Sequence, residues 1–370
     1  MYERNSRRTR LRALGAGIAV VAGSLAVGAA PAVALPSSGG ALFTISNDAS
    51  GNEVLVYRRA ADGSLTLVDT VATGGLGSGG GLGSQGAVTL SDDGKRLLVV
   101  NAGSDSLSMF RVNGTHLSLK DVDHTRGDTP ISVDVHGNLA FVVNAGSSTI
   151  EGFRVGHGRL VPLRHSVRQL SGDAVGPAQV EFSPSGRRLA VTEKATNQIV
   201  TFPVGSHGWV GRAKVSPSAG ETPFGFEFDP YGRLVVSEAF GGAPGAGTVS
   251  TYSLRHGGAV AAIDTAATTQ TAACWIAVTD DGAYVYTTNT GSASVTSYRL
   301  AHDGTLSLLA QTGVGDGPID LDFSTGDRYL YVLNGASDSI SVLAAGPDGS
   351  LSAVDTLVGL PATGAGIAAS

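Results

Sequence analysis

Two glutamates stand at matching places in neighbouring copies of a repeated phrase, and residues of this type can do acid and base chemistry. The phrase is a short apolar run that ends in a polar residue, as at residues 97–101. In five copies the last residue is asparagine, and in the other two it is Glu193 or Glu238. Two carboxylates beside one pocket can divide the acid and base roles if their surroundings separate their pKa values. We therefore predict Glu193 and Glu238 as catalytic residues. The alternative interpretation is a pair of solvated charges, or an ion pair of Glu193 with Lys194.

The asparagines of the phrase have two interpretations. An asparagine at the start of a turn bonds to the nearby backbone, so geometry alone can explain them. If the asparagines lie together on one face of the fold, they would also bind substrate. A glutamine, a lysine and two aromatic residues near the repeated phrases would then bind it with them. For the aromatic residues the alternative is packing between sheets. The predicted substrate-binding residues are Asn101, Asn144, Asn289, Asn334, Gln179, Lys194, Phe224 and Trp275.

A further set of acids, Glu181, Glu227 and Asp322, holds equivalent positions in three other short apolar runs. Grouped oxygen ligands suit a hard cation such as Ca²⁺, and the alternative is that these carboxylates are simply hydrogen-bonded in a sheet. No HExxH, HxH or CxxC spacing is present, so we assign no metal ligands and expect no cofactor. There is also no GxSxG and no P-loop sequence.

These residues are positioned by a repeat. Seven copies of the phrase, ending at Asn47, Asn101, Asn144, Glu193, Glu238, Asn289 and Asn334, follow one another at intervals of 43 to 54 residues. Each copy is preceded by a short apolar run and followed by a run of alternating apolar and polar residues, and a fourth run comes after that. Turn residues separate these four runs, which predicts four antiparallel strands per copy. Seven such sheets in series predict an all-β fold, a seven-bladed β-propeller.

The two ends of the repeat region predict how the ring closes. The first copy begins at residue 41 without a preceding inner run, whereas residues 359–369 are left over at the other end. We predict that this C-terminal segment supplies the inner strand of the first blade, which would leave no open sheet edge. Residues 35–370 then form one domain. Within it, the turns after the repeated phrase and the connections between blades share one rim, where we place the site.

The first 34 residues read as an export signal. Five arginines precede a Gly/Ala-rich apolar stretch, and residues 32–34 fit an A-x-A cleavage site. The signal is either of the twin-arginine type or a general secretory signal. We expect the mature chain to be exported, extracellular or in the cell envelope, without a stable membrane span. Without the five arginines and Glu3, the 25 basic and 31 acidic residues fall to 20 and 30, a net charge of −10. Such an acidic chain is a poor partner for nucleic acid.

The repeat resembles the seven-bladed lactonase propellers, a family that includes bacterial 6-phosphogluconolactonase of the cycloisomerase type and carboxymuconate-lactonizing enzyme. The resemblance covers nearly all of residues 41–369, and phrases such as PAQVEFSPSGRRLAVTEKATNQIVTF and TPFGFEFD are similar to an exported bacterial branch of unassigned activity. In the family's enzymes a Pro-Arg-His and an Asn-Glu-Leu sequence meet at the channel mouth. Here the first reads Pro177-Ala178-Gln179, and Lys194 falls at the position of the family's glutamate. The candidates to substitute for the missing basic pair on the rim are His124, Arg126 or Arg168.

Three hypotheses follow. In the first, the protein is an exported lactonase-like propeller that hydrolyses or isomerises a lactone or sugar-acid-like small molecule at the channel mouth. In the second, it is a non-catalytic propeller that binds a ligand or a protein there. In the third, it is a metal-dependent hydrolase that uses Glu181, Glu227 and Asp322. The oligomeric state is left open.

Overall fold

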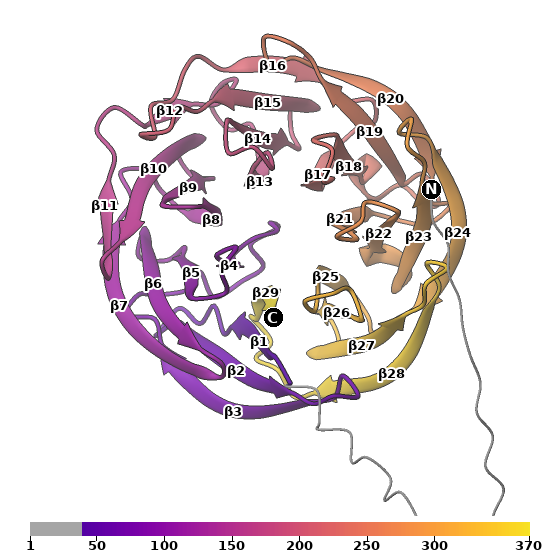
Figure 1. The fold of residues 1–370 in the computed structure, drawn as a ribbon, viewed down its shortest axis with the longest axis horizontal. Helices are drawn as coiled ribbons and strands as arrows, with labels where there is room; N and C mark the ends of the chain where they lie inside the picture. Colours follow the sequence, from indigo (N-terminus) through magenta and orange to yellow (C-terminus); the bar gives the residue numbers. More distant parts are fainter. Residues whose placement is uncertain (1–38) are drawn as a thin grey trace, which may run out of the picture. The chain divides into compact units, whose positions relative to one another are not determined.

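The computed structural model describes residues 39–370, which form seven antiparallel sheets arranged as blades around a ring (Figure 1). Each blade has four strands in order from the centre outwards, and the third blade has in addition a short fifth strand that pairs with its third strand. The innermost strands are β29 (Ala365–Ala369), β4 (Val88–Leu90), β8 (Pro130–His136), β13 (Pro177–Phe182), β17 (Pro223–Phe228), β21 (Ala273–Val278) and β25 (Pro318–Phe323). The second strands are β1 (Ala41–Ile45), β5 (Arg96–Asn101), β9 (Leu139–Asn144), β14 (Arg188–Glu193), β18 (Leu234–Glu238), β22 (Tyr284–Asn289) and β26 (Tyr329–Asn334).

The outer half of each blade carries the remaining strands. The third strands are β2 (Glu53–Arg59), β6 (Ser106–Asn113), β10 (Thr149–Gly156), β15 (Gln198–Pro203), β19 (Thr248–Leu254), β23 (Ser294–Leu300) and β27 (Ser339–Ala345). The outermost strands are β3 (Leu65–Ala72), β7 (His116–His124), β11 (Arg159–Pro162) with the short β12 (Arg168–Gln169), β16 (Lys214–Pro217), β20 (Val260–Ala267), β24 (Leu306–Gly313) and β28 (Leu351–Val358). Two single turns of 3₁₀ helix, Phe240–Gly242 and Thr290–Ser292, follow β18 and β22.

The prediction of a seven-bladed all-β propeller closed by the C-terminal segment is confirmed. Strand β29 pairs antiparallel with β1, with Phe43 opposite Ala368 and Leu42 opposite Ala369. The backbone of Ser370 donates to the carbonyl of Ala41, which extends the pairing to the last residue. The first blade is therefore assembled from both ends of the repeat region, and Figure 1 shows β29 beside β1.

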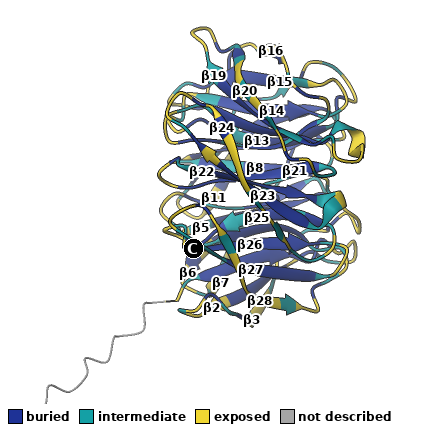
Figure 2. Cartoon of the chain, turned by 90° about the vertical axis from the view of Figure 1, so that its right-hand side faces the viewer, coloured by how far each residue is buried: buried dark blue, intermediate teal, exposed yellow. Residues whose placement is uncertain are grey.

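Burial follows the position of a strand in its blade. The second strands are buried on both faces because the neighbouring blades cover them, as in β9, β22 and β26, where every residue is buried. The outermost strands are largely exposed, as in β28. Figure 2 shows the same gradient, with dark blue strands inside and yellow residues on loops and outer strands. Burying apolar side chains between blades is the main stabilising term of this fold.

The described residues include no helix long and apolar enough to span a membrane. The predicted signal at residues 1–34 lies outside the described residues.

Candidate functional site

A cavity of about 520 Å³ lies among the innermost strands. Its lining comes from all seven blades and includes Asp92, Pro184 and Asp280, which belong to the turns that join the first and second strands. The cavity therefore extends towards the face that carries these turns. This is the face opposite to the rim on which the sequence placed the site.

Four carboxylates surround the middle of this cavity, one from each of four innermost strands, and we call them the carboxylate ring. They are Asp134, Glu181, Glu227 and Asp322. Each accepts a hydrogen bond from a backbone N–H of the next blade. The donors are Phe182 (2.7 Å to Asp134), Phe228 (3.0 Å to Glu181), Val278 (2.8 Å to Glu227) and Ala369 (2.8 Å to Asp322). The ring thus joins adjacent blades at the same time as it lines the cavity.

Burial raises the pKa of every member of the carboxylate ring, because the low-dielectric interior disfavours the charged form. The pKa of Asp134 rises to about 6, that of Asp322 to about 7 and that of Glu227 to about 8. The pKa of Glu181 is also well above its usual value, first through burial and then through the nearby charges of Glu227 and Asp134. At neutral pH this ring therefore holds both protonated and ionised carboxyl groups.

The other end of the cavity is closed by two glutamines. Gln179 accepts from the N–H of Phe226 and donates to its carbonyl, both at 2.8 Å. The corresponding position in the next blade is Gly225, which has no side chain. Gln85 fills this gap from across the ring, accepting from the N–H of Ile276 at 3.2 Å and donating to its carbonyl at 2.7 Å. A Cβ at Gly225 would lie 2.4 Å from the Oε1 atom of Gln85, so this contact requires glycine.

Gln85 belongs to the glycine-rich segment 74–86. In the structure this segment is held at several points. Asn47 donates to Ser78 and to the carbonyl of Gly80. Ser84 donates to the carbonyl of Ile131, and Lys194 donates to that of Gly83. In Figure 1 the trace before β4 reaches into the middle of the ring. The segment covers the end of the cavity where we had expected an open mouth.

Three of the predicted substrate-binding residues meet under this segment. The Nζ atom of Lys194 lies 4.6 Å from the centre of the Phe224 ring, and Phe224 packs edge-on against Trp275 with ring centres 4.9 Å apart. Burial lowers the pKa of Lys194 to about 8. Gln179 lines the cavity. The structure therefore brings Lys194, Phe224 and Trp275 together, and their substrate-binding role stays a prediction.

The polar residues at or just after the ends of the second strands form a separate set, which we call the anchor ring. It consists of Asn47, Asn101, Asn144, Glu193, Glu238, Asn289 and Asn334, all buried. The asparagine side chains donate mainly to hydroxyl groups of the third strand, as from Asn101 to Ser108 (2.8 Å) and from Asn334 to Ser341 (3.0 Å). Asn289 and Asn144 do the same with Thr296 and Thr149. None of the seven lines the cavity. Their bonds agree with a structural role, with hydroxyls rather than turn backbone as the main partners, and the substrate-binding role of Asn101, Asn144, Asn289 and Asn334 stays a prediction.

The two predicted catalytic glutamates share this arrangement. Glu193 accepts from the N–H of Ser171 at 2.9 Å and from the hydroxyl of Thr196 at 2.6 Å. Glu238 accepts from the hydroxyls of Thr248 (2.6 Å), Ser250 and Tyr252 (both 3.0 Å). Burial raises the pKa of Glu238, although these hydrogen bonds act to lower it. The structure therefore holds each carboxylate with separate partners and gives the two no shared cavity. Their catalytic role stays a prediction.

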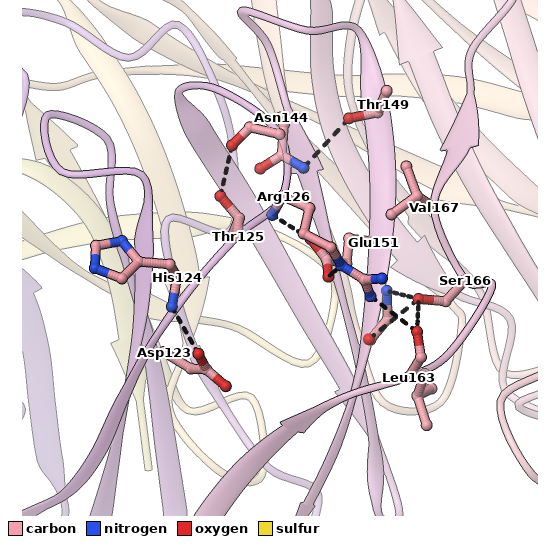
Figure 3. A network of polar contacts seen from close by, with 12 residues as sticks. Asp123, His124, Thr125, Arg126, Asn144, Thr149, Glu151, Leu163, Ser166 and Val167 are labelled. Carbon is pink, nitrogen blue, oxygen red and sulfur yellow. Dashed lines mark hydrogen bonds and ion pairs between the residues drawn. The ribbon is translucent and has the colours of Figure 1, made fainter.

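The substitutes suggested for the family's basic pair are also engaged elsewhere or lie at the surface. Arg126 donates through its backbone N–H and its Nε atom to the buried carboxylate of Glu151, both at 2.6 Å (Figure 3). Arg168 donates to the carbonyls of His165, Val167 and Val210. His124 is exposed. None of the three lines the cavity.

The sequence singled out Glu181, Glu227 and Asp322 as acids at equivalent positions, and the structure puts all three in the cavity lining. Sequence reasoning missed Asp134, although the run at residues 131–136 has an acid at the same position. Within residues 39–370 no group of three or more His, Cys, Asp or Glu side chains is placed to hold a metal ion. The carboxylate ring therefore gives the metal-dependent hypothesis no ready ligand set.

The fold and this cavity define a seven-bladed propeller with an acidic central cavity, and comparison with known proteins identifies its family. The model of the lactonase family of seven-bladed β-propellers matches residues 45–175, 165–239 and 246–364. The chain belongs to this family. No curated protein matches it.

Solved structures agree on the fold. A protein from Lactobacillus plantarum is similar with a TM-score of 0.74 and 20% identity, over 89% of this chain and 98% of that one. The periplasmic gluconolactonase of Pseudomonas aeruginosa has a TM-score of 0.70 and 19% identity, over 88% and 98%. Hydrazine synthase from Kuenenia stuttgartiensis is also similar, with a TM-score of 0.60 and 20% identity over 85% and 95%. Because proteins with such different names share this fold, structural similarity by itself does not identify the activity of this chain.

Proposed function

We propose that the protein hydrolyses the ring ester of a small lactone inside the central cavity. Membership of the lactonase propeller family supports the reaction class. The observation that carries the proposal is the carboxylate ring, in which neighbouring acids have different pKa values within one cavity. Groups whose environments separate their pKa values are suited to opposite roles in proton transfer.

The roles follow from the protonation states at neutral pH. Glu227, with a pKa of about 8, is mainly protonated and would donate a proton to the ester oxygen that leaves as the ring opens. Asp134, with a pKa of about 6, is mainly ionised and would accept a proton from the attacking water. Glu181 lies between them in blade order, and its own pKa is raised first by burial and then by the charges of Glu227 and Asp134.

The cavity also restricts the substrate. A volume of about 520 Å³ fits a small molecule. The lining contains acids but no lysine or arginine, so an anionic sugar-acid lactone would be repelled and a neutral lactone is preferred. We further propose that the mature chain acts outside the cytoplasm, in line with the predicted signal at residues 1–34.

A second candidate function is ligand binding without turnover. It is favoured by the replacement of the family's basic pair by Ala178 and Gln179, and by the structural bonds that each carboxylate of the ring already makes across blades.

The test is hydrolysis of a panel of neutral and anionic lactones by the wild-type protein, with and without chelator. We expect neutral lactones to be hydrolysed in a chelator-independent way, with a rate that rises with pH through about 6 and falls above about 8. Glu227→Gln should lower the rate by about 100-fold or more, the usual contribution of a general acid.

Glu193→Gln and Glu238→Gln are matched controls, since they make the same change outside the cavity. If these variants lose activity and Glu227→Gln keeps it, the sequence-based assignment is right and the present one wrong. Absence of turnover on every lactone favours the binding function instead.

A further inference from the structure

A second cavity, away from the centre of the ring, is lined by basic residues. It holds about 320 Å³ and lies between the second blade and the turn at residues 156–158, which joins β10 to β11 in the third blade. Figure 1 shows β11 beside β7 at this junction. The lining includes no aspartate or glutamate, although the chain is acidic. Its four lysines and arginines are Lys95, Arg96, Arg111 and Lys120.

This cavity exists because the second blade lacks a contact that other blades make. In four blades a hydroxyl of the second or third strand donates to a glycine carbonyl in the outer turn of the following blade. The pairs are Thr201 with Gly258, Thr251 with Gly304, Tyr286 with Gly349 and Tyr331 with Gly63.

The second blade has no donor at these positions. Leu98, three residues before Asn101, corresponds to the two tyrosines, and Met109 lies opposite Leu98 on β6 where other blades have a threonine. Neither side chain can donate a hydrogen bond of this kind. A Cβ atom at Gly158 would meet nothing within 4 Å, so the turn of the third blade leaves open space beside the second blade.

The strand register places two of the four cations against each other. Arg96 on β5 is paired directly with Arg111 on β6, and like charges at such opposite positions destabilise a sheet. Arg96 donates to the carbonyl of Gly137 at 3.1 Å. The other three side chains make no hydrogen bond or ion pair within residues 39–370, and they are those of Lys95, Arg111 and Lys120.

Two carboxylates near this group are already engaged. Asp93 lies 3.9 Å from Arg96 and accepts from the hydroxyl of Ser91 at 2.6 Å. Asp121 accepts from the N–H of Leu160 at 2.8 Å. Set against four cations, these two acids leave an excess of two positive charges, which a dianion in the cavity would balance.

From this arrangement we propose that the second cavity binds a small organic phosphate. The phosphate group lies between Arg96 and Arg111, and the organic group rests against the buried Met109 and Phe110, which form the apolar part of the lining. A guanidinium group suits phosphate because it can donate two parallel hydrogen bonds to it. A bound phosphate would also separate the two arginine charges that the sheet register brings together.

This site shares no lining residue with the central cavity. The inference therefore does not rest on the proposed hydrolysis of lactones, and either can fail without the other.

The experiment is calorimetric titration of the protein with phenyl phosphate at pH 8 and low salt, where the phosphate group carries about two negative charges. The comparison ligands are phenol, which has the ring without the charge, and inorganic phosphate, which has the charge without the ring. We expect one phenyl phosphate to bind per chain, inorganic phosphate to bind about tenfold more weakly, and phenol not to bind. Equal binding of phenol, equal binding of inorganic phosphate, or no binding of phenyl phosphate up to about 1 mM would overturn the proposal.

Arg111→Gln removes one of the opposed cations at an exposed position, and we expect it to weaken phenyl phosphate binding about tenfold. Arg299→Gln is the matched control, because Arg299 holds the same place in the sixth blade but lies opposite Tyr284. It should leave binding unchanged. Equal losses in the two variants would mean that the ligand responds only to net charge, which contradicts a specific site.

Leu98→Tyr gives the second blade the tyrosine of the sixth and seventh blades. Its side chain should fill the space beside Gly158 and weaken phenyl phosphate binding at least as much as Arg111→Gln does. Unchanged affinity would place the ligand elsewhere and overturn the proposal. If Leu98→Tyr does not fold, the comparison of Arg111→Gln with Arg299→Gln still decides the question.

Discussion

The anchor ring and the carboxylate ring are each built from single polar side chains contributed blade by blade, yet their surroundings differ. The anchor residues face hydroxyl groups of their own blades, as Glu238 does with Thr248 and Ser250. The ring carboxylates face a cavity and bond to the next blade, as Glu227 does with Val278. A residue type that recurs in nearly every blade bonds to hydroxyl groups that most blades also repeat. The acids that occur in only some inner strands are the ones that line the cavity.

The largest effect should come from breaking the anchor ring. Replacing Glu238 by alanine removes the acceptor of several buried hydroxyls, and unpaired buried groups are costly. We expect the free energy of unfolding to fall by about 3 kcal/mol. Urea denaturation measures this, and Glu238→Gln, which keeps an acceptor, should lose much less. Equal losses, or a loss near zero for alanine, would mean that the hydroxyl network does not hold this blade.

A second test concerns the blade where the anchor pattern itself changes. At the place of Ser108, Thr296 and Ser341, the third blade has Glu151, whose buried carboxylate depends on Arg126 (Figure 3). Arg126→Ala should lower the free energy of unfolding by about 2 kcal/mol, less than for a fully buried pair because half of the arginine side chain is exposed.

Adding Glu151→Thr to Arg126→Ala restores the hydroxyl found in the other blades. We expect the double variant to regain most of the lost stability in the same urea experiment. A double variant less stable than Arg126→Ala would contradict the idea that Glu151 replaces a hydroxyl of the anchor pattern.

The carboxylate ring should show itself in the pH dependence of stability. The folded-state pKa values of about 6, 7 and 8 lie above the usual values near 4, so the folded state holds protons that the unfolded chain releases. This contribution is fully present below about pH 4 and is lost as pH rises through 6 to 8. The charges that face Glu227 are those of Asp322, Asp327 and Asp280.

Unfolding free energies measured from pH 6 to 9 should therefore decrease with pH, by at most about 1.4 kcal/mol per pH unit for each group that titrates. Glu227→Gln removes one such group and should be more stable than the wild type at pH 9, by about 1–2 kcal/mol. A flat profile in the wild type would mean that the ring carboxylates ionise freely, and the comparison between the two rings would then fail.

The smallest effect is expected at the closed end of the cavity. Gln85→Ala removes two hydrogen bonds to Ile276, worth about 1 kcal/mol each. The main effect should be local, because the loss releases the segment around residue 85 from the opposite blade. Hydrogen exchange at Ile276 and along residues 79–86 should become faster while global stability changes little. Gly225→Ala should also speed exchange along this segment, but with a larger loss of global stability, because its Cβ would lie 2.4 Å from the Oε1 atom of Gln85 and 2.8 Å from the backbone carbonyl oxygen of Cys274. Unchanged exchange in both variants would show that Gln85 does not close the cavity.

Much of the fold could be predicted from the sequence because its evidence is local and repeated. Alternation of apolar and polar residues gives the strands, and seven copies of the phrase give the number of blades. The missing inner run before residue 41 gave the closure by β29. Equivalent positions in the inner runs also singled out Glu181, Glu227 and Asp322, which line the cavity.

The site could be predicted only in part, because it depends on contacts between distant residues. Gln85 and Ile276 are 191 residues apart, and nothing in the glycine-rich segment 74–86 indicates that it crosses the ring. Similarly, no spacing rule pairs Arg126 with Glu151, or turns Glu193 and Glu238 towards hydroxyls rather than towards a common pocket.

The sequence by itself determined the strands, the seven blades and the acidic character of the innermost strands, since each of these is written in short repeated patterns. The tertiary structure alone decided which end of the channel is open and which carboxylates share a cavity. The physical reason is that the burial and hydrogen bonding of each side chain depend on its neighbours. Many of these neighbours belong to other blades and come close only when the ring closes.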